Sequence, residues 1–303
     1  SNDYPRNRRV FLAIASMSGD ETPRIVERIA ELDSRVTLLE NKRKIVPHAW
    51  NIALLQAKGE VIARVDGHAT IPADYLSRAV HVLQKHPEAI AVGGSVEAVP
   101  STEWQRAVVY ALRARLGAGS ARFRPVGRYV TTLSFPIFRR EAFERYGGFD
   151  ERFVRSQDFE FNLRLIKNGE RIWQDPSIRS YYWPRRSPRA LWKQYWQYGY
   201  WKVRTFWKHR YLSPKDIIVP GFWVTLLCLG GLAIWFWPSL WGLLGLVSFY
   251  GAALVANGLQ AAVNGHDMKL LLLVPAALFI LHLGFGVGAW WGGISLFTQR
   301  GKF

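Results

Sequence analysis

Three consecutive residues, Asp66, Gly67 and His68, follow the apolar run "VIARV" and include two side chains that bind metal ions. Residues two apart in an extended segment project to the same side, so the Asp66 carboxylate and the His68 imidazole can reach one ion. Gly67 between them lets a bulky ligand approach the backbone. Carboxylate oxygen suits Mg²⁺ or Mn²⁺, and imidazole shifts the preference toward Mn²⁺. An ordinary Asp-Gly turn is the alternative explanation.

The elements that must position these residues are short apolar runs alternating with helical patterns. Strands are expected at 10–14, 36–40, 60–65 and 89–94, and helices at 22–32, 47–59 and 73–86. This alternation predicts an α/β domain with a largely parallel sheet. In such sheets ligands bind at the carboxyl ends of strands, and the strand at 60–65 delivers Asp66 and His68 to such an end.

Charge is confined to the first 216 residues, because 37 of the 40 Lys and Arg and 22 of the 23 Asp and Glu precede Ile217. The apolar runs that follow approach or exceed the roughly 20 residues that cross a bilayer core. We expect about three spans, at Ile217–Trp237, Leu240–Ala262 and Leu270–Phe297. The excess of Lys and Arg before them favours a cytoplasmic location for the water-soluble part. With Cys228 as the single cysteine, a disulfide framework and a cysteine-based zinc site are excluded.

A basic aromatic segment lies between the two parts. From Asp175 to Asp216 there are ten Lys and Arg, many Trp and Tyr, and no intervening acidic residue. Cations and aromatic rings also bind single-stranded nucleic acid. A position directly ahead of apolar runs instead favours an amphipathic segment on anionic membrane lipids, so we expect no nucleic-acid partner.

Three longer stretches, in order, resemble family 2 glycosyltransferases of the GT-A fold, most of all the membrane-anchored enzymes of succinoglycan-type exopolysaccharide biosynthesis. They are "SMSGDET", "LLENKRKIVPHAWNIALLQAKGEVIARVDGHATIPADYL" and "FRREAFERYGGFDERFVRSQDFEFNLRLIKNGERI". The resemblance covers roughly residues 10 to 205. It implies a GT-A catalytic domain, Rossmann-like with a mostly parallel sheet, at 1–183, then the amphipathic membrane-interface segment at 184–216 and a transmembrane helix bundle at 217–303.

The resemblance implies an inverting enzyme that moves a sugar from a nucleotide sugar, with UDP as the expected nucleotide, to a lipid-linked acceptor. Asp66 and His68 match the position that holds the donor diphosphate through Mn²⁺ or Mg²⁺, and Asp20 and Asn51 match donor-binding positions. Asp158 matches the general base that takes the proton from the acceptor hydroxyl. A carboxylate at the start of a helix is favoured in its charged form, as a base requires; a simple helix cap is the alternative.

Acceptor residues are expected in the basic aromatic segment. Gln194, Gln197 and Trp201 partly match a Gln-x-x-Arg-Trp motif that lines the acceptor channel of processive relatives, but the Arg is missing. We therefore expect transfer of one or a few sugars to a polyprenyl-diphosphate-linked or other lipid-linked acceptor. Arg185 and Arg186 could meet the lipid diphosphate, with ordinary leaflet contacts as the alternative.

Two departures from the family bear on activity. The chain starts after the usual first strand and helix, and Ala15 stands where relatives place an Asp that contacts the uracil ring. A catalytically impaired or truncated membrane subunit is therefore the competing interpretation.

The expected location is the inner membrane of a bacterium, with the catalytic domain in the cytoplasm. Three spans would leave the C-terminal "TQRGKF" on the far side, against the positive-inside tendency. The last apolar run, with Pro275 inside it, is therefore expected to be broken or re-entrant.

Overall fold

The chain forms two compact units that are interleaved in sequence. The computed structural model describes residues 11–15, 21–66, 69–117, 123, 125–211, 214–233 and 235–298. Unit 1 consists of Ser1–Glu97 and Arg122–Tyr182, and unit 2 of Ala98–Ala121 and Trp183–Phe303. The chain therefore passes between the units at three points, and neither unit is a continuous segment.

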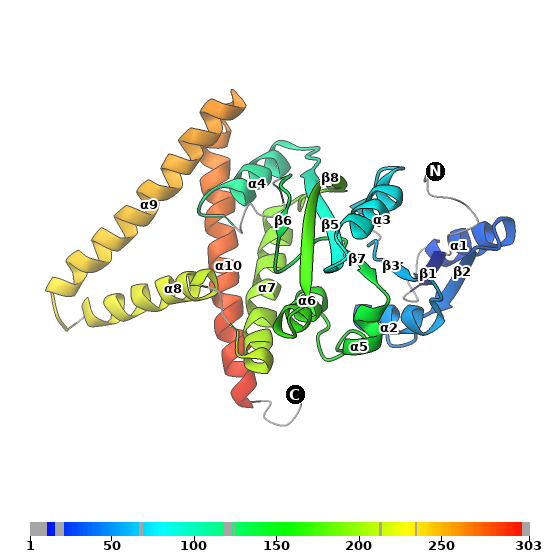
Figure 1. Cartoon of the computed structure of the whole chain (residues 1–303). Coiled ribbons are helices and arrows are strands. Elements are labelled where there is room, and N and C mark those ends of the chain that lie inside the picture. The colour runs from blue at the N-terminus through cyan, green and yellow to red at the C-terminus, as the bar shows by residue number, and fades with distance from the viewer. Residues whose placement is uncertain are drawn as a thin grey trace. The chain divides into compact units, whose positions relative to one another are not determined.

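Unit 1 alternates strands and helices as the sequence predicts (Figure 1). Its strands are β1 (Phe11–Ala15), β2 (Val36–Glu40), β3 (Val61–Ala63), β4 (Ala69–Thr70), β5 (Ala89–Ala98), β6 (Arg128–Tyr129), β7 (Ile137–Arg139) and β8 (Arg171–Tyr182). Its helices are α1 (Thr22–Leu32), α2 (Val46–Gln56), α3 (Tyr75–Lys85), α5 (Glu141–Tyr146) and α6 (Gln157–Lys167). Every predicted strand and helix before residue 95 is present.

The strands of unit 1 form two sheets. β1 and β2 pair in parallel, from Phe11 opposite Val36 to Ala15 opposite Glu40. The larger sheet has the order β3-β7-β5-β8-β4, with β6 also paired to β8. β7 runs antiparallel to β3 and β5, and β8 runs antiparallel to β4 and β6.

The α/β architecture is thus confirmed, but the sheet is mixed rather than mostly parallel. Alternating strands and helices predict parallel neighbours only where a helix connects two adjacent strands. β7 and β8 instead enter the sheet beside strands that precede them in the chain and run the opposite way.

Consecutive side chains of β7 point to opposite faces of the larger sheet, as they do in any β-strand. Ile137 is fully buried among residues of α3, including Tyr75. Phe138 faces the other side, where its ring lies 5.4 Å from that of Phe161 on α6. Burial of each such side chain stabilises the fold by about 1.5–3 kcal/mol, and the Phe138–Phe161 contact fixes α6 against the sheet.

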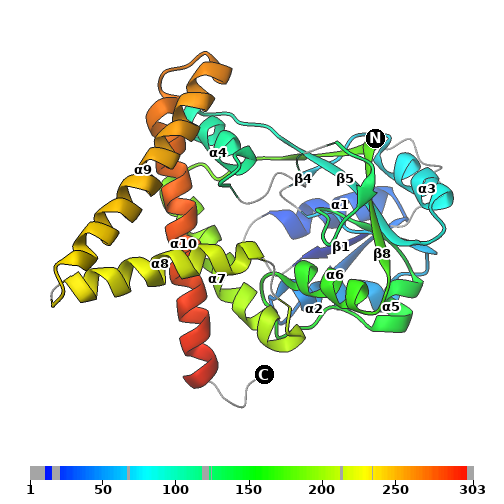
Figure 2. The same ribbon diagram turned by 60° about the vertical axis from the view of Figure 1, so that its left-hand side comes forward.

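Unit 2 consists of helices (Figure 2). These are α4 (Glu103–Arg113), α7 (Pro188–His209), α8 (Pro214–Ala233), α9 (Pro238–Gly265) and α10 (Leu270–Thr298). α4, which the sequence analysis placed inside the catalytic domain, belongs to unit 2. Among the described residues α9 and α10 are long and apolar enough to cross a membrane, with mean hydropathies of 1.7 and 2.4; the apolar part of α8, Gly221–Leu232, is shorter.

α10 is one continuous helix, so the expected break in the last apolar run is absent. Pro275 lies in the second turn, where a proline removes one backbone hydrogen bond of the helix. Its ring packs closely against Gly258 of α9, where a Cβ would approach the ring to 2.8 Å.

α7 and α10 pack with their backbones in contact. A Cβ at Gly288 of α10 would lie 2.0 Å from the carbonyl oxygen of Trp196, and a Cβ at Gly199 of α7 would be equally close to the backbone of α10. Gly284 and Gly292, one turn to either side of Gly288, also face α7. Small residues at this spacing let two helices approach closely, so the glycines specify this pairing.

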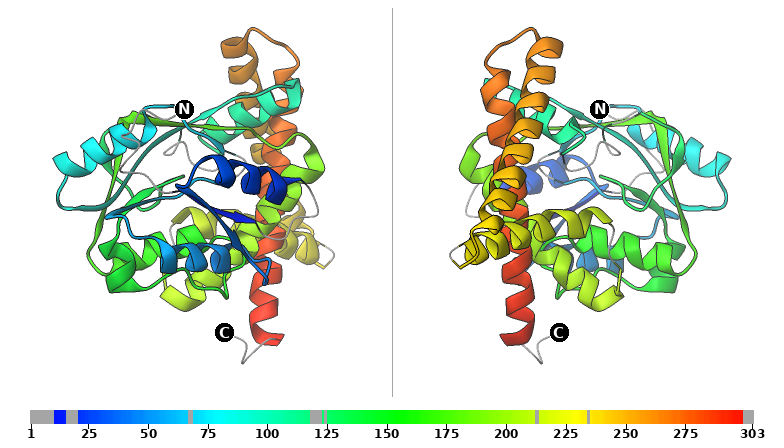
Figure 3. Two further views of the ribbon diagram at one scale, coloured as in Figure 1. Left: turned by 90° about the vertical axis from the view of Figure 1, so that its right-hand side faces the viewer. Right: turned by 90° about the vertical axis from the view of Figure 1, so that its left-hand side faces the viewer.

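The turn between α9 and α10 is fixed to α4 by charges. α9 turns back onto α10 at its C-terminal end (Figure 3). Arg106 Nη1 lies 3.1 Å from Asp267 Oδ2, and Lys269 pairs with Glu103. Further along α10, His282 Nε2 contacts the carbonyl oxygen of Leu116 at 2.7 Å, so α4 and the turn after it follow the first half of α10.

Candidate active site

The two carboxylates expected to act in catalysis lie on either side of one guanidinium. Arg64 Nε and Nη2 donate to Asp66 Oδ1 and Oδ2 at 3.0 and 2.9 Å. Arg64 Nη1 lies 3.5 Å from Asp158 Oδ2. Arg64 and Asp66 directly follow β3, and Asp158 is in the first turn of α6. The fold therefore brings two sites that are distant in sequence to one point of unit 1.

Exposure increases from the guanidinium outward. The Arg64 side chain is 8% exposed, that of Asp66 21% and that of Asp158 41%. The guanidinium carbon of Arg64 lies 5.4 Å from the centre of the Trp50 ring. Burial opposes the charge on Arg64, but the carboxylates of Asp158 and Asp66 outweigh this and raise its pKa. Arg64 is thus a permanent cation, and the carboxylates are the part that a ligand can reach.

Ser156 and not Asp158 occupies the N-cap position of α6. Its φ of 58° is left-handed, which is uncommon for a residue other than glycine. Asp158 is the second residue of the helix, and its Oδ1 accepts a hydrogen bond from Phe159 N at 2.8 Å. Oδ2 faces Arg64, so Asp158 is more than a helix cap.

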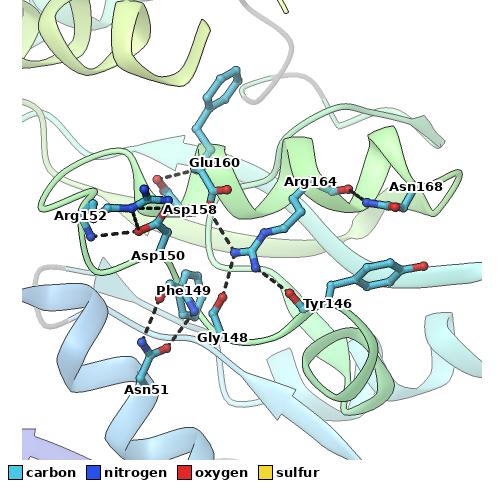
Figure 4. A network of polar contacts seen from close by, with 11 residues as sticks. Asn51, Tyr146, Gly148, Phe149, Asp150, Arg152, Asp158, Glu160, Arg164 and Asn168 are labelled. Atoms are coloured by element: carbon cyan, nitrogen blue, oxygen red, sulfur yellow. Dashed lines mark hydrogen bonds and ion pairs between the residues drawn. The ribbon is translucent and has the colours of Figure 1, made fainter. Parts of the chain in front are cut away.

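Asn51 fixes the loop before α6 (Figure 4). Its Nδ2 donates to the carbonyl oxygen of Phe149 at 2.9 Å and to Glu151 Oε1 at 3.1 Å, while its Oδ1 accepts from Phe149 N at 2.8 Å. A Cβ at Gly148 would lie 2.4 Å from Asn51 Oδ1, so a larger residue there would displace the Asn51 amide from its hydrogen bonds. Both amide hydrogens are used within unit 1, and the geometry gives no support to the predicted contact of Asn51 with the donor.

Arg164 fixes the same loop from α6 (Figure 4). Its Nη1 donates to Tyr146 O at 2.6 Å, and its Nη2 donates to Gly148 O at 2.8 Å and to Glu160 Oε2 at 3.1 Å. Glu160 is fully buried, which requires such a partner. The "GGFDE" loop is therefore held from both α2 and α6.

Glu151 collects three donors at the end of this loop. Arg43 Nη1 lies 2.7 Å away, His48 Nδ1 2.9 Å and Asn51 Nδ2 3.1 Å. Partial burial opposes ionisation, but the hydrogen bonds from His48 and Asn51 and the charges of His48 and Arg43 outweigh it, so the pKa of Glu151 is lowered. Asp150 is bound by Arg152 Nη2 at 2.7 Å.

The remaining predicted site residues are distributed as follows. Asp20 and His68 lie outside the described residues. Arg185, Arg186, Gln194, Gln197 and Trp201 belong to unit 2. Both arginines are exposed, Gln194 Nε2 donates to the hydroxyl of Tyr198 at 3.1 Å, and the guanidinium of Arg204 lies 5.5 Å from the Trp201 ring centre.

Among the described residues, a divalent cation at Asp66 needs further ligands from a bound molecule. The described residues contain no group of three His, Cys, Asp or Glu that could hold an ion by themselves. Mg²⁺ and Mn²⁺ are commonly bound by one or two carboxylates together with substrate phosphates. The Asp66 side chain is 21% exposed, and although both oxygens accept from Arg64, each has a further lone pair for a cation that arrives with a diphosphate.

A cavity of about 360 Å³ adjoins the loop network but not the carboxylates. It is lined by Asn51, Leu54, Leu55, Ile62, Arg140, Phe143, Glu144, Gly148 and Phe149. Its one guanidinium, Arg140, donates to backbone carbonyls of Ala57 and Gly59. The cavity lining therefore does not include the candidate residues Asp66 and Asp158.

Arg64 is the site residue that the sequence analysis missed. Arg64 lies within the apolar run "VIARV", and no role was predicted for it. The signal was a lone charge in an apolar strand, because a buried cation needs an anionic partner. Asp66, two positions further along the chain, could be recognised from the sequence as that partner, whereas Asp158 could not.

Comparison with known proteins identifies the family of the chain. The model of glycosyl transferase family 2 matches residues 11–147. The succinoglycan biosynthesis protein ExoA of Rhizobium meliloti (strain 1021) is 31% identical over 94% of this chain and 86% of its own length. The chain belongs to glycosyl transferase family 2. It is a glycosyltransferase with the GT-A fold, as the sequence motifs predicted.

Two further proteins extend the family comparison. A dolichyl N-acetyl-alpha-D-glucosaminyl phosphate 3-beta-D-2,3-diacetamido-2,3-dideoxy-beta-D-glucuronosyltransferase of Methanococcus voltae is 22% identical over 97% of this chain and 90% of its own. Among solved structures, the mannosyltransferase PcManGT of Pyrobaculum calidifontis, in complex with GDP-Man and Mn²⁺, has a TM-score of 0.55 and 23% identity, covering 94% of this chain and 79% of its own. S. aureus TarS 1-349 in complex with UDP has a TM-score of 0.50 and 18% identity, covering 99% and 85%.

Proposed function

We propose that this family 2 glycosyltransferase moves a sugar from a nucleotide donor, with UDP as the expected nucleotide, to a lipid-linked acceptor in exopolysaccharide or cell-envelope glycan synthesis. The observation that carries the proposal is the placement of Asp66 and Asp158 on one guanidinium. A donor diphosphate at Asp66 and an acceptor hydroxyl at Asp158 would then be neighbours, as direct transfer requires.

In this proposal Asp66 shares a cation with the donor diphosphate. When bound, Mn²⁺ or Mg²⁺ would neutralise the diphosphate as the glycosidic bond breaks. Asp158 takes the proton of the acceptor hydroxyl, whose oxygen attacks the anomeric carbon on the face opposite the departing diphosphate. One displacement inverts that carbon and needs no protein nucleophile. Arg64 lies between Asp66 and Asp158 and holds both carboxylates in place.

The proposed acceptor and location follow from unit 2 and from the relatives. ExoA is named for succinoglycan biosynthesis, and the Methanococcus voltae relative for a dolichyl-linked phosphate substrate. α9 supplies an apolar membrane helix, and exposed Arg185 and Arg186 precede α7. We therefore place the enzyme at the bacterial inner membrane with its catalytic unit in the cytoplasm, where a lipid diphosphate could contact these arginines.

Calorimetric titration of UDP and GDP into the detergent-purified chain, with and without Mn²⁺, tests the donor. We expect metal-dependent UDP binding that Asp66→Asn abolishes and Asp158→Asn retains. Product analysis by NMR with a UDP-sugar and extracted polyprenyl lipids then tests inversion. Nucleotide binding that is unchanged by Asp66→Asn, or no binding of either nucleotide, would overturn the proposal and favour the impaired membrane subunit.

A further inference from the structure

α8 and the first half of α9 form a hairpin whose surface is apolar. From Ile217 to His266 the chain has no Asp, Glu, Lys or Arg. The Phe222 and Tyr250 ring centres lie 4.7 Å apart, and further along Leu229 packs beside Gly242. Trp235, Phe236, Trp237, Trp241 and Phe249 are 90%, 59%, 66%, 64% and 74% exposed. Such a patch on a protein surface marks contact with lipid or with another protein.

α10 has a different environment, although it is more apolar than α9. In its most apolar window 44% of the residues are buried, against 11% in α9. α7 covers its second half in parallel register, since Gly284 faces Trp192 and Gly292 faces Tyr200. α4 and the turn after it cover the first half, ending with the contact of His282 to Leu116 O.

These neighbours bring exposed cations to the middle of α10. Arg189 and Lys193 are exposed and lie beside Trp192, at the level of Gly284. Arg113 and Arg115 are exposed next to Leu116, at the level of His282. α10 has 29 residues and is about 43 Å long, so its middle would lie near the centre of a bilayer that it crossed. Charges there are strongly disfavoured, and the nearest headgroups would be beyond the reach of these side chains.

We infer that α10 lies along the membrane surface together with α4 and α7, and that the α8–α9 hairpin enters the near leaflet. From Tyr250, where α9 meets His282 of α10, twelve residues lead to Pro238, about 18 Å of helix. The hydrocarbon core is about 30 Å thick, so the aromatic tip reaches roughly its middle. The occupant of the apolar surface is thus the acyl chains of one leaflet, with anionic headgroups at the cations of α4 and α7.

This arrangement rests on the proposed membrane attachment and removes the topological conflict noted in the sequence. α10 can remain a continuous helix, because neither end needs to cross to the far side. The described end of α10, at Thr298, then lies on the same side as α4, in agreement with the positive-inside tendency for the basic "TQRGKF" segment.

Thiol accessibility in sealed membrane vesicles of known orientation tests the inference. In a Cys228→Ser background, single cysteines replace Met268 in the α9–α10 turn, Phe297 at the end of α10 and Trp237 at the hairpin tip; all three positions are exposed. We expect Met268→Cys and Phe297→Cys to react with an impermeant maleimide from the cytoplasmic face only. Trp237→Cys and the native Cys228 should react only after detergent is added.

Opposite sidedness at positions 268 and 297 would show that α10 crosses the bilayer and overturn the inference. Reaction at position 237 from the far face would overturn it too, because the hairpin would then span. Release of the chain by alkaline carbonate, with Cys228 freely reactive, would instead overturn the membrane attachment on which it rests. UDP titration of the same preparations reports separately on the donor site.

Discussion

Arg64 holds Asp66 through two parallel hydrogen bonds of 3.0 and 2.9 Å. The same guanidinium faces the candidate base Asp158. A buried cation therefore joins the expected donor side of the site to its acceptor side, and both carboxylates depend on Arg64 for their position.

Replacement of Arg64 should reduce both stability and transfer. Arg64→Ala leaves Asp66 and Asp158 without their cation; both carboxylates keep access to water, so we expect a loss of about 1.5–3 kcal/mol, the range for hydrogen bonds to charged groups. Arg64→Lys keeps the charge but cannot reproduce the bidentate geometry, so we expect Tm to recover more than kcat. Thermal unfolding and sugar transfer to extracted lipids are measured together. Wild-type kcat in Arg64→Ala would show that the contact is incidental.

Asp158→Asn should separate binding from chemistry. A general base typically contributes 10²–10⁴-fold, so we expect kcat to fall by about that factor while the Kd for UDP stays unchanged. Asp74→Asn is the control, because Asp74 pairs with Arg78 on α3 and contacts neither Arg64 nor Asp66 in the described interactions. An equal loss of activity in both variants would mean that the effect is not specific to position 158.

Asn51 and Gly148 should be energetically coupled. Gly148→Ala places a Cβ 2.4 Å from Asn51 Oδ1 and should lower Tm sharply. Asn51→Ala removes its hydrogen bonds to Phe149 and Glu151, at a cost of about 1–3 kcal/mol. In the double variant the steric conflict is gone, so the two losses should not add. Additive losses in urea unfolding would contradict the arrangement.

Protonation of Glu151 should make the free energy of unfolding depend on pH. Its pKa in the folded chain lies below the ordinary value of 4.5, so ionised Glu151 binds Arg43 and His48 more strongly than the protonated form does. This contribution is fully present above about pH 4.5 and is lost as pH falls through the lowered pKa. Urea midpoints of the wild type and Glu151→Gln, measured between pH 3 and 7, should converge at low pH. Parallel curves would rule out the assignment.

The glycine contact between α7 and α10 offers a matched pair of variants. Gly288→Ala brings a Cβ within 2.0 Å of Trp196 O, whereas Gly293, on the same helix, has nothing within 4 Å of its Cβ position. We expect Gly288→Ala to lower Tm in detergent. Gly293→Ala should leave Tm unchanged or raise it slightly, since alanine favours helix by about 1 kcal/mol. The opposite order would mean that α7 and α10 do not pack in this register.

Secondary structure that depends on nearby residues could be predicted from the sequence. Helices such as α1, expected at 22–32, have a strong apolar period and were located to the residue. β7 was not predicted, because a strand of three residues, Ile137–Arg139, is too short to show a hydrophobic period. α4 reads as an ordinary amphipathic helix, and only its distant partners in α10 assign it to unit 2.

For the candidate site, motif resemblance predicted roles for Asp66 and Asp158, which stay predictions, but it did not predict the residue that joins them. Asp66 is two positions from Arg64, whereas Asp158 reaches Arg64 only after β7, β5 and α6 have been assembled. Asn51 was assigned to the donor because its position matches the family. Its bonds to Phe149 became visible only in three dimensions.

The insertion of α4 between two parts of unit 1 constrains how this enzyme can be made. α4 is encoded before β6, β7 and β8, yet its buried residues, among them Val108 and Leu112, belong to the unit completed by α10. During synthesis the apolar side chains of α4 would therefore stay exposed until α10, near the end of the chain, has left the ribosome. We therefore expect that truncation after residue 183 would not yield a free soluble enzyme, because α4 would lose its packing partner α10.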